Sequence, residues 1–163
     1  MLEKRDFYIN GKWVAPIEGR DHNVIDPSTE EPCAVISLGG KADADAAVAA
    51  AKAALPGWMA TPAEERIALV EKLVEVYKAR ADDLAAAMST EMGAPISMSK
   101  ASQVGAGTWH LSNFIAAAKK FDFFRPLGDH APNDRIIYEA VGVAALITPW
   151  NWPMNQVTLK VGA

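Results

Sequence analysis

The stretch Thr148–Pro153 holds the residues of this sequence that are best suited to binding a ligand. It places one side-chain amide, Asn151, between two tryptophans, and a proline on each side restricts the backbone. The apolar run Val143–Ile147 before it has the length of a strand buried on both faces, and residues 154–163 predict a helix. Ligands of α/β proteins bind outside the carboxyl ends of strands, beside helix N-termini. The arrangement favours a binding site at Asn151, although composition alone favours a strand, turn and helix held by aromatic packing.

Two glycine-containing stretches are weaker candidates for binding phosphate. In Gly39–Lys41, Ala42 stands where a phosphate loop needs serine or threonine, and the first glycine of that pattern is missing. Gly105 and Gly107 begin like a dinucleotide fingerprint, but His110 replaces its last glycine and no strand precedes them. We therefore expect Gly105 and Gly107 to allow close packing between helices.

The remaining residues with possible chemistry favour structural roles. The three histidines (His22, His110 and His130) lie far apart without metal-ligand spacing, so we expect surface or interface positions and predict no metal site. Cys33 lies within a predicted strand and is expected to be a small core residue rather than a nucleophile. Three further tryptophans are expected to pack rather than to stack on ligands: Trp13, Trp58 and Trp109.

Composition limits the class of protein. The chain has 163 residues, of which 50% are hydrophobic and 22% charged, enough for one sizeable core. Its net charge of −4 does not favour nucleic acid or an anionic membrane surface, and no apolar run approaches the ~20 residues of a membrane helix. Its single cysteine suits a reducing compartment. We expect a cytoplasmic protein without nucleic-acid or membrane partners.

Short strands and then helices must position this stretch. Residues 7–14 predict a hairpin around Asn10-Gly11, and residues 24–26 and 33–38 predict two more strands, paired antiparallel. Residues 43–55 predict a helix closed by Pro56-Gly57. Thr61–Glu64 predicts a capped start, with the Thr61 hydroxyl at the N-cap. Further helical patterns follow, one ending at Gly93 and one running from Pro95 to about Lys120 with its buried face at Leu111, Phe114, Ile115 and Ala118.

A change of period at Phe121 predicts a β-ribbon. Residues 121–125 and 135–139 read as strands around a polar loop at 128–133. An isolated ribbon is marginal in water, so we expect it to pair with another part of the protein or another subunit. Because only one strand-and-helix unit is visible and the last helix has no cap, we expect the chain to be the front portion of a longer protein.

Residues 148–153, followed by Gln156 and Lys160, resemble the signature of the NAD(P)-dependent aldehyde dehydrogenase superfamily. The resemblance covers essentially the whole chain, as its N-terminal portion. Five further segments occur in the family's order: Tyr8–Val14, Asp26–Thr29, Glu65-Arg66, Glu91–Pro95 and Glu139–Val143.

The resemblance implies an α/β fold with small antiparallel strands, a helical segment, a β-ribbon arm and the first βα unit of a Rossmann-like cofactor domain. Residues 1–120 would belong to the cofactor-binding domain, residues 121–140 to an oligomerisation arm and residues 141–163 to the truncated core. It also implies a homo-dimer or homo-tetramer joined through the 121–139 ribbon.

The resemblance further implies oxidation of an aldehyde to a carboxylic acid with NAD or NADP, through a cysteine thiohemiacetal. Asn151 would donate its amide to the substrate oxygen, and Lys160 would lie behind the active site, with a purely structural role for this lysine equally supported. The cofactor side would be lined by Ile147, Thr148, Pro149, Trp150 and Asn151. Trp152 and Gln156 would shape the aldehyde pocket.

One departure leaves an alternative open. The family's nucleophilic cysteine and general-base glutamate have no counterpart in residues 1–163, and Cys33 does not match the nucleophile. We expect the chain alone to be inactive. The alternative to an enzyme is a truncated fragment, or an interaction module that acts through its ribbon and exposed helix faces.

Overall fold

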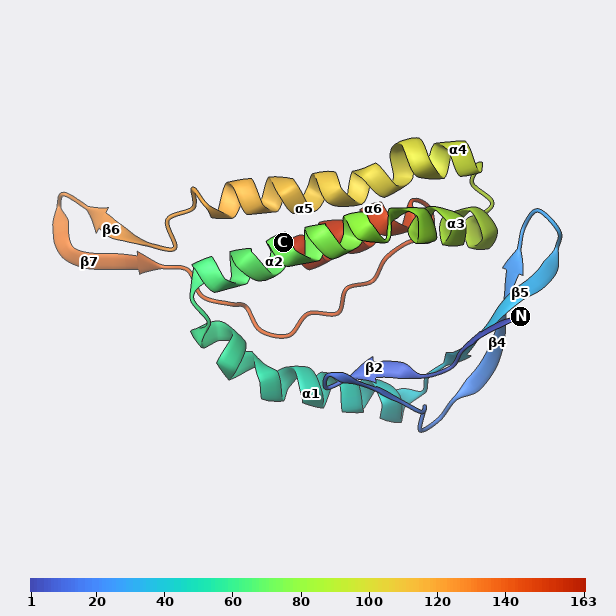
Figure 1. Cartoon of the computed structure of the whole chain (residues 1–163). Helices are drawn as coiled ribbons and strands as arrows, with labels where there is room; N and C mark the ends of the chain where they lie inside the picture. Colours follow the sequence, from blue (N-terminus) through green and yellow to red (C-terminus); the bar gives the residue numbers. More distant parts are fainter.

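The computed structural model describes residues 1–163 and has a mixed α/β architecture (Figure 1). Three helices form a layer: α2 (Ala63–Ala79), α5 (Val104–Ala118) and α6 (Pro153–Gly162). Helix α1 (Lys41–Ala60) lies apart from this layer, beside the N-terminal strands. The predicted helix at residues 154–163 is confirmed, with Pro153 in its first turn, where the missing N–H costs no hydrogen bond. None of the helices combines the length and the apolar character that crossing a membrane requires.

The N-terminal strands form two small sheets. Strands β2 (Phe7–Ile9) and β3 (Lys12–Val14) make the predicted hairpin, with φ of 53° at Asn10 and 76° at Gly11. Strands β4 (Arg20–Asp26) and β5 (Glu31–Leu38) are antiparallel, as predicted, but longer than expected. Strand β1 (Leu2–Lys4) pairs parallel with β5 and was not predicted, because a short charged segment carries no strand pattern.

Two predicted helix boundaries were wrong. Helix α1 continues through Pro56 to Ala60, since proline removes one hydrogen bond without necessarily ending a helix. The Thr61 hydroxyl does not cap α2; it donates to the carbonyl of Gly57 at 2.9 Å. The reason is that Thr61 also closes α1, whose last carbonyls compete for the hydroxyl.

The helical core lies where α2, α3 (Ala81–Met92) and α5 meet. Tyr77, Ala85, Met88 and Val104 form its buried cluster. The Tyr77 hydroxyl donates to the carbonyl of Val104 at 3.0 Å, and burial raises the pKa of Tyr77 to about 12. Helix α3 ends at Gly93 with φ of 77°, the left-handed conformation predicted for its C-terminus.

The long helix predicted from Pro95 forms in three continuous parts. Helix α4 (Ile96–Met98) leads into a π-helical turn, η1 (Ser99–Gln103), and then into α5. Leu111 is fully buried, and Phe114, Ile115 and Ala118 are half-buried, which confirms the predicted face.

Of the two glycines in α5, Gly105 and Gly107, only Gly107 is required for close packing. A Cβ at Gly107 would lie 2.6 Å from Cζ of Tyr77, whereas a Cβ at Gly105 would meet no atom within 4 Å. We therefore expect Gly107→Ala to reduce the free energy of unfolding by about 1–3 kcal/mol. The matched control Gly105→Ala should raise it by about 0.5–1 kcal/mol, because alanine favours a helix. Denaturant unfolding of both variants measures this difference, and equal effects would contradict the assigned contact.

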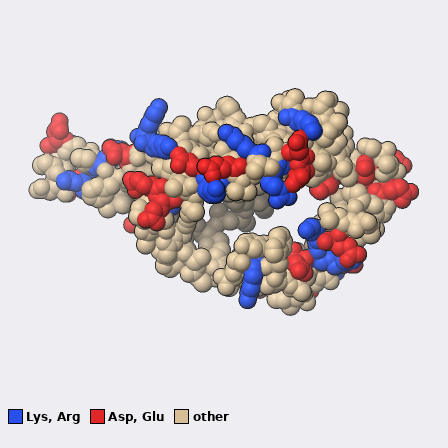
Figure 2. Space-filling model, in the orientation of Figure 1, with Lys and Arg blue, Asp and Glu red and all other residues tan.

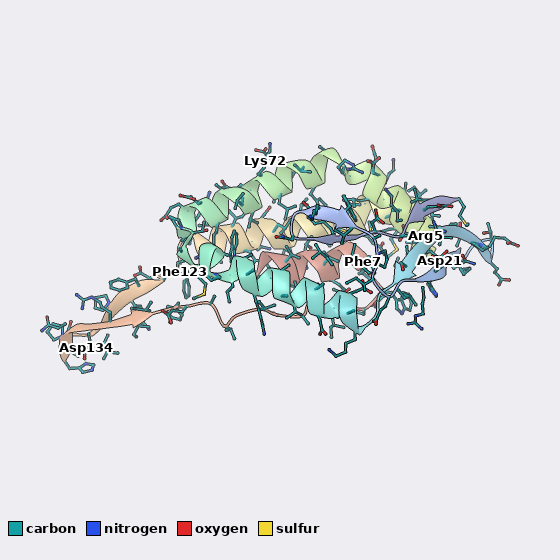
Figure 3. All side chains as sticks on the ribbon, turned by 90° about the horizontal axis from the view of Figure 1, so that it is seen from below. Arg5, Phe7, Asp21, Lys72, Phe123 and Asp134 are labelled. Carbon is teal, nitrogen blue, oxygen red and sulfur yellow. The ribbon has the colours of Figure 1, made fainter.

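The ribbon forms, but nearer its tip than predicted. Strands β6 (Phe124–Gly128) and β7 (Ala131–Ile137) pair antiparallel around a turn at Asp129 and His130. The predicted bounds of the strands (121–125 and 135–139) and of the loop (128–133) were therefore wrong. The strands extend into the predicted loop, because polar side chains do not prevent backbone pairing. The ribbon projects from the helical layer, with Phe123 at its base and Asp134 toward its tip (Figures 1 and 3).

The predicted strand Val143–Ile147 is absent. Residues 139–149 have no regular secondary structure and are exposed; the exposed fraction of Ile147 is 84%. The segment runs extended between the helical layer and α1 (Figure 1), where the surface is hollowed (Figure 2). A strand needs a neighbour for its backbone hydrogen bonds, and no sheet of this chain accepts the segment.

Candidate functional site around Asn151

The turn that carries Asn151 contains a strained residue. Trp152, which immediately precedes α6, has φ of 57° and ψ of 59°, the left-handed conformation. For a bulky side chain this conformation costs about 1–3 kcal/mol and persists only when the surroundings hold it. Such strain is concentrated at functional sites. The spacing of the tryptophans and prolines identified this turn as a candidate site, but the residue types did not predict the left-handed conformation of Trp152.

The residues predicted to line a cofactor form one continuous exposed run. Thr148 and Pro149 are exposed, and the exposed fraction of Trp150 is 80%. The backbone groups of residues 147–151 make no hydrogen bond to other backbone groups. Asn151 is exposed at the end of this run. The run therefore presents free peptide donors and acceptors together with one side-chain amide.

Three other predicted site residues lie on or directly before α6. Lys160 Nζ donates to Oε1 of Gln156 at 3.1 Å, so these two half-buried side chains are joined one helical turn apart. Trp152 is half-buried. The hydrogen-bond partner of Lys160 is Gln156 rather than Asn151, in keeping with a separation of about two and a half helical turns along the chain.

Helix α6 is held against α5 at both of its ends. Near its start, His110 Nε2 lies 2.7 Å from Asn155 Oδ1. Near its end, a Cβ at Gly162 would lie 2.7 Å from Phe114 Cδ2 and 3.2 Å from Leu111 Cδ2, so the helices approach closely there. The expectation of a surface or interface histidine was wrong for His110, which is half-buried within the chain. Its sequence neighbourhood gave no signal, because its partner lies 45 residues away.

The glycines before α1 serve its own structure. The buried carboxylate of Asp43 accepts hydrogen bonds from the backbone N–H groups of Gly40, Ile17 and Glu18, at 2.9, 2.6 and 3.2 Å. Phe7 packs beside Gly39, where a Cβ would lie 3.1 Å from the ring, and Figure 3 shows Phe7 next to α1. The Asp43 carboxylate thus occupies the position that a bound phosphate would need.

These bonds predict how the stability contributed by Asp43 depends on pH. The Gly40 N–H, followed by that of Ile17, lowers the pKa of Asp43 below its ordinary 3.8. A lowered folded-state pKa means that the stabilisation is complete above about pH 4–5 and is lost as the pH falls through the folded-state pKa. We therefore expect Asp43→Asn to lower the thermal midpoint at neutral pH, and the difference from wild type to shrink below pH 3.8.

Thermal unfolding between acidic and neutral pH checks this expectation. The matched control is Asp45→Asn, two residues further along α1, because the Asp45 side chain is exposed. It should change the midpoint little, since exposed ion pairs contribute little. A difference between Asp43→Asn and wild type that stayed constant across this pH range would contradict the role of the ionised carboxylate.

The other candidates do not form a site. Cys33 is half-buried, and its thiol donates to the carbonyl of Val24 at 3.3 Å. Trp13 and Trp109, although 68% and 64% exposed, pack edge-on against Tyr8 and His110, with ring centroids 5.2 and 4.9 Å apart, in keeping with the predicted packing role; Trp58 is 48% exposed. No three His, Cys, Asp or Glu side chains gather closely enough to hold a metal ion.

Two cavities lie away from Asn151. The larger, about 690 Å³, is lined mainly by apolar residues of α2, α5 and residues 137–141, and by residues 161–163 at the opposite end of α6 from Asn151. The other, about 540 Å³, lies between β2 and the start of α1. Neither of these two cavities includes residues 147–156, of which 147–151 are exposed.

Comparisons with known proteins give consistent results. The sequence model of the aldehyde dehydrogenase family matches residues 13–163. The chain is 39% identical, over 99% of its length, to 3-succinoylsemialdehyde-pyridine dehydrogenase of a Pseudomonas species, of which it covers 33%. It therefore spans about a third of the length of such relatives.

Solved structures share its fold. An aldehyde dehydrogenase from Bartonella henselae superposes with a TM-score of 0.94 at 52% identity, over 97% of this chain and 33% of that one. A mutant of aldehyde dehydrogenase C from Pseudomonas syringae, in complex with NAD⁺ and octanal, gives a TM-score of 0.92 at 40% identity, over 97% and 32% of the two chains. These matches confirm the predicted fold class.

Proposed function

The chain belongs to the aldehyde dehydrogenase family, and we propose that it forms one wall of the active site of an enzyme that oxidises an aldehyde to a carboxylic acid with NAD or NADP. The observation that carries this proposal is the position of Asn151, an exposed amide at a strained turn directly before α6. By full-length protein we mean a polypeptide that carries this chain together with the rest of the family's length.

Asn151 suits the stabilisation of negative charge on the substrate oxygen. When a cysteine thiolate attacks the aldehyde carbon, a C–S bond forms and the carbonyl electron pair moves onto oxygen. The Asn151 amide donates a hydrogen bond to this oxygen, and because an amide does not titrate, it remains a donor at every working pH. The thiolate and the base that later activates water come from outside residues 1–163.

The exposed run before Asn151 suits a nicotinamide cofactor. NAD or NADP, when bound, supplies the acceptor for the hydride removed from the substrate. Ile147, Thr148, Pro149 and Trp150 have exposed backbone without backbone partners, so their peptide groups are free to bind it. Trp152 and Gln156 follow Asn151 in the chain, and in this proposal their side chains contact the aldehyde. Lys160 acts through Gln156, to which it is hydrogen-bonded.

The ribbon is the proposed contact between subunits. Residues 121–140 form the arm, residues 1–120 belong to the cofactor-binding domain, and residues 141–163 begin its core. Strands β6 and β7 lie at the edge of the chain and carry charges of both signs (Figure 2). Unpaired strand edges of this kind favour pairing with another chain. Light scattering of the full-length protein would measure its mass and distinguish a dimer or tetramer from a monomer.

An enzyme assay tests the proposed activity. Aldehydes of different size and charge are offered to the full-length protein with NAD⁺ or NADP⁺, and the reduced nicotinamide and the acid are measured. We expect one mole of reduced cofactor for each mole of acid formed. If no aldehyde is oxidised with either cofactor, the proposal is wrong.

The alternative is an interaction module without catalysis. The exposed apolar residues Val141 and Ile147, at 108% and 84% exposure, favour this function because such surface normally contacts a partner. The intact mass of the natural product in cells separates the two. A polypeptide of the family's full length supports the enzyme, whereas a stable product of residues 1–163 supports the module.

A further inference from the structure

One polar contact joins the site helix to the rest of the chain and has no part in the proposed chemistry. His110 on α5 and Asn155 on α6 are both half-buried, and their Nε2 and Oδ1 atoms are 2.7 Å apart. A carbonyl oxygen can only accept, so Nε2 carries the hydrogen and donates it. The contact bridges two helices that are far apart in sequence.

This hydrogen bond supplies a restraint that the apolar contacts of α6 lack. At the far end of the helix, Leu111 and Phe114 pack close to Gly162 and set the distance between α5 and α6. Apolar contact is non-directional, so it does not fix how α6 is rotated or how far it slides. A directional hydrogen bond at Asn155 fixes both at the end of the helix where the site begins.

The contact also lies next to the strained turn. Asn155 is the third residue of α6, and Trp152, in its left-handed conformation, immediately precedes the helix. A strained residue keeps its conformation only while its surroundings hold it. Asn151 precedes Trp152, so any relaxation of that residue would redirect the Asn151 amide.

We propose that His110 is a positioning residue for aldehyde oxidation: by donating to Asn155 it holds the first turn of α6, and thereby the Trp152 turn and the Asn151 amide, in the catalytic orientation. This role rests on the proposed function. It differs from a purely structural role, because its whole effect on turnover passes through Asn151.

A double-mutant cycle in the full-length protein tests this role. His110→Leu should lower kcat between about 10- and 100-fold, the loss typical of a catalytic group displaced by about 1 Å. Cofactor affinity should change less than about twofold, since the backbone of residues 147–150 is unaltered. His110→Gln keeps an N–H donor and should retain most of the activity. The matched control is His22→Leu on β4, an exposed histidine, which should leave turnover unchanged.

The decisive comparison is His110→Leu in an Asn151→Ala background, where it should have almost no further effect on kcat. An equal loss in both backgrounds, or no loss in either, would overturn the positioning role. Should His110→Leu fail to fold, Asn155→Ala removes the acceptor instead, and the same comparison with Asn151→Ala decides the question. If the wild-type full-length protein oxidises no aldehyde, both the proposed function and the positioning role are wrong. If the wild-type protein is active but the double-mutant cycle gives either of the results above, only the positioning role is wrong.

Discussion

Replacing Asn151 by alanine in the full-length protein is expected to lower kcat by about 10²–10³, the usual cost of removing one donor from an oxyanion site. The loss appears in kcat because the hydrogen bond strengthens as charge develops on the substrate oxygen and contributes less in the ground state. The dissociation constant of the cofactor should stay within about twofold, since the peptide groups of residues 147–150 are unchanged. Steady-state kinetics and a cofactor titration measure the two effects.

A matched asparagine shows whether the loss belongs to the site. Asn113 is exposed on α5, so Asn113→Ala should leave kcat within about twofold of wild type. Asn151→Asp keeps the shape but replaces the donor with a carboxylate, which repels the developing charge, so it should be at least as damaging as alanine. Unchanged turnover in Asn151→Ala would exclude the assigned role, even if aldehyde oxidation itself is observed.

The second large effect is expected at Leu111, the fully buried residue where α5 meets α6. Leu111→Ala should lower the free energy of unfolding by about 2–5 kcal/mol, since it removes buried methyl groups and leaves a cavity. The control is Leu69→Ala on α2, where the side chain is 56% exposed. Less apolar surface is buried there, so its cost should be at most about 1 kcal/mol.

Denaturant unfolding of the two leucine variants gives the comparison. A Leu111→Ala variant no less stable than Leu69→Ala would show that α6 does not pack on α5 through this side chain. Because Leu111 anchors the helix that follows Asn151, we also expect Leu111→Ala to lose aldehyde oxidation at a lower temperature than wild type. Residual activity after timed heating measures this second consequence.

Local signals in the sequence were sufficient wherever a few neighbouring residues determine the backbone. Asn10 and Gly11 predicted the hairpin and Gly93 the end of α3, and both are confirmed. The helix predicted over residues 154–163 is also confirmed, and it begins at Pro153. In each case the residue's own φ preference decides the conformation. The Thr148–Pro153 motif likewise identified the family, which the comparisons confirm.

Predictions failed where two segments compete for one hydrogen-bonding group, and where a segment needs a distant partner to form its structure. Thr61 has a good capping sequence, but its hydroxyl is taken by the carbonyl of Gly57. Val143–Ile147 has the composition of a buried strand, but a strand forms only against a neighbour, and no sheet in this chain provides one. The strand propensity of a sequence describes one segment, whereas the pairing of strands depends on two segments.

Residue types and spacing were sufficient to recognise the family, the fold class and the short motif in which Asn151 is the candidate donor. How that motif is held depends on contacts between segments that are distant in the chain. The left-handed turn at Trp152 lies directly before α6, and the contact between His110 and Asn155 joins α6 to α5. Residue types and short-range spacing act through local backbone preferences. The orientation of a helix depends on atoms brought together from positions 45 residues apart.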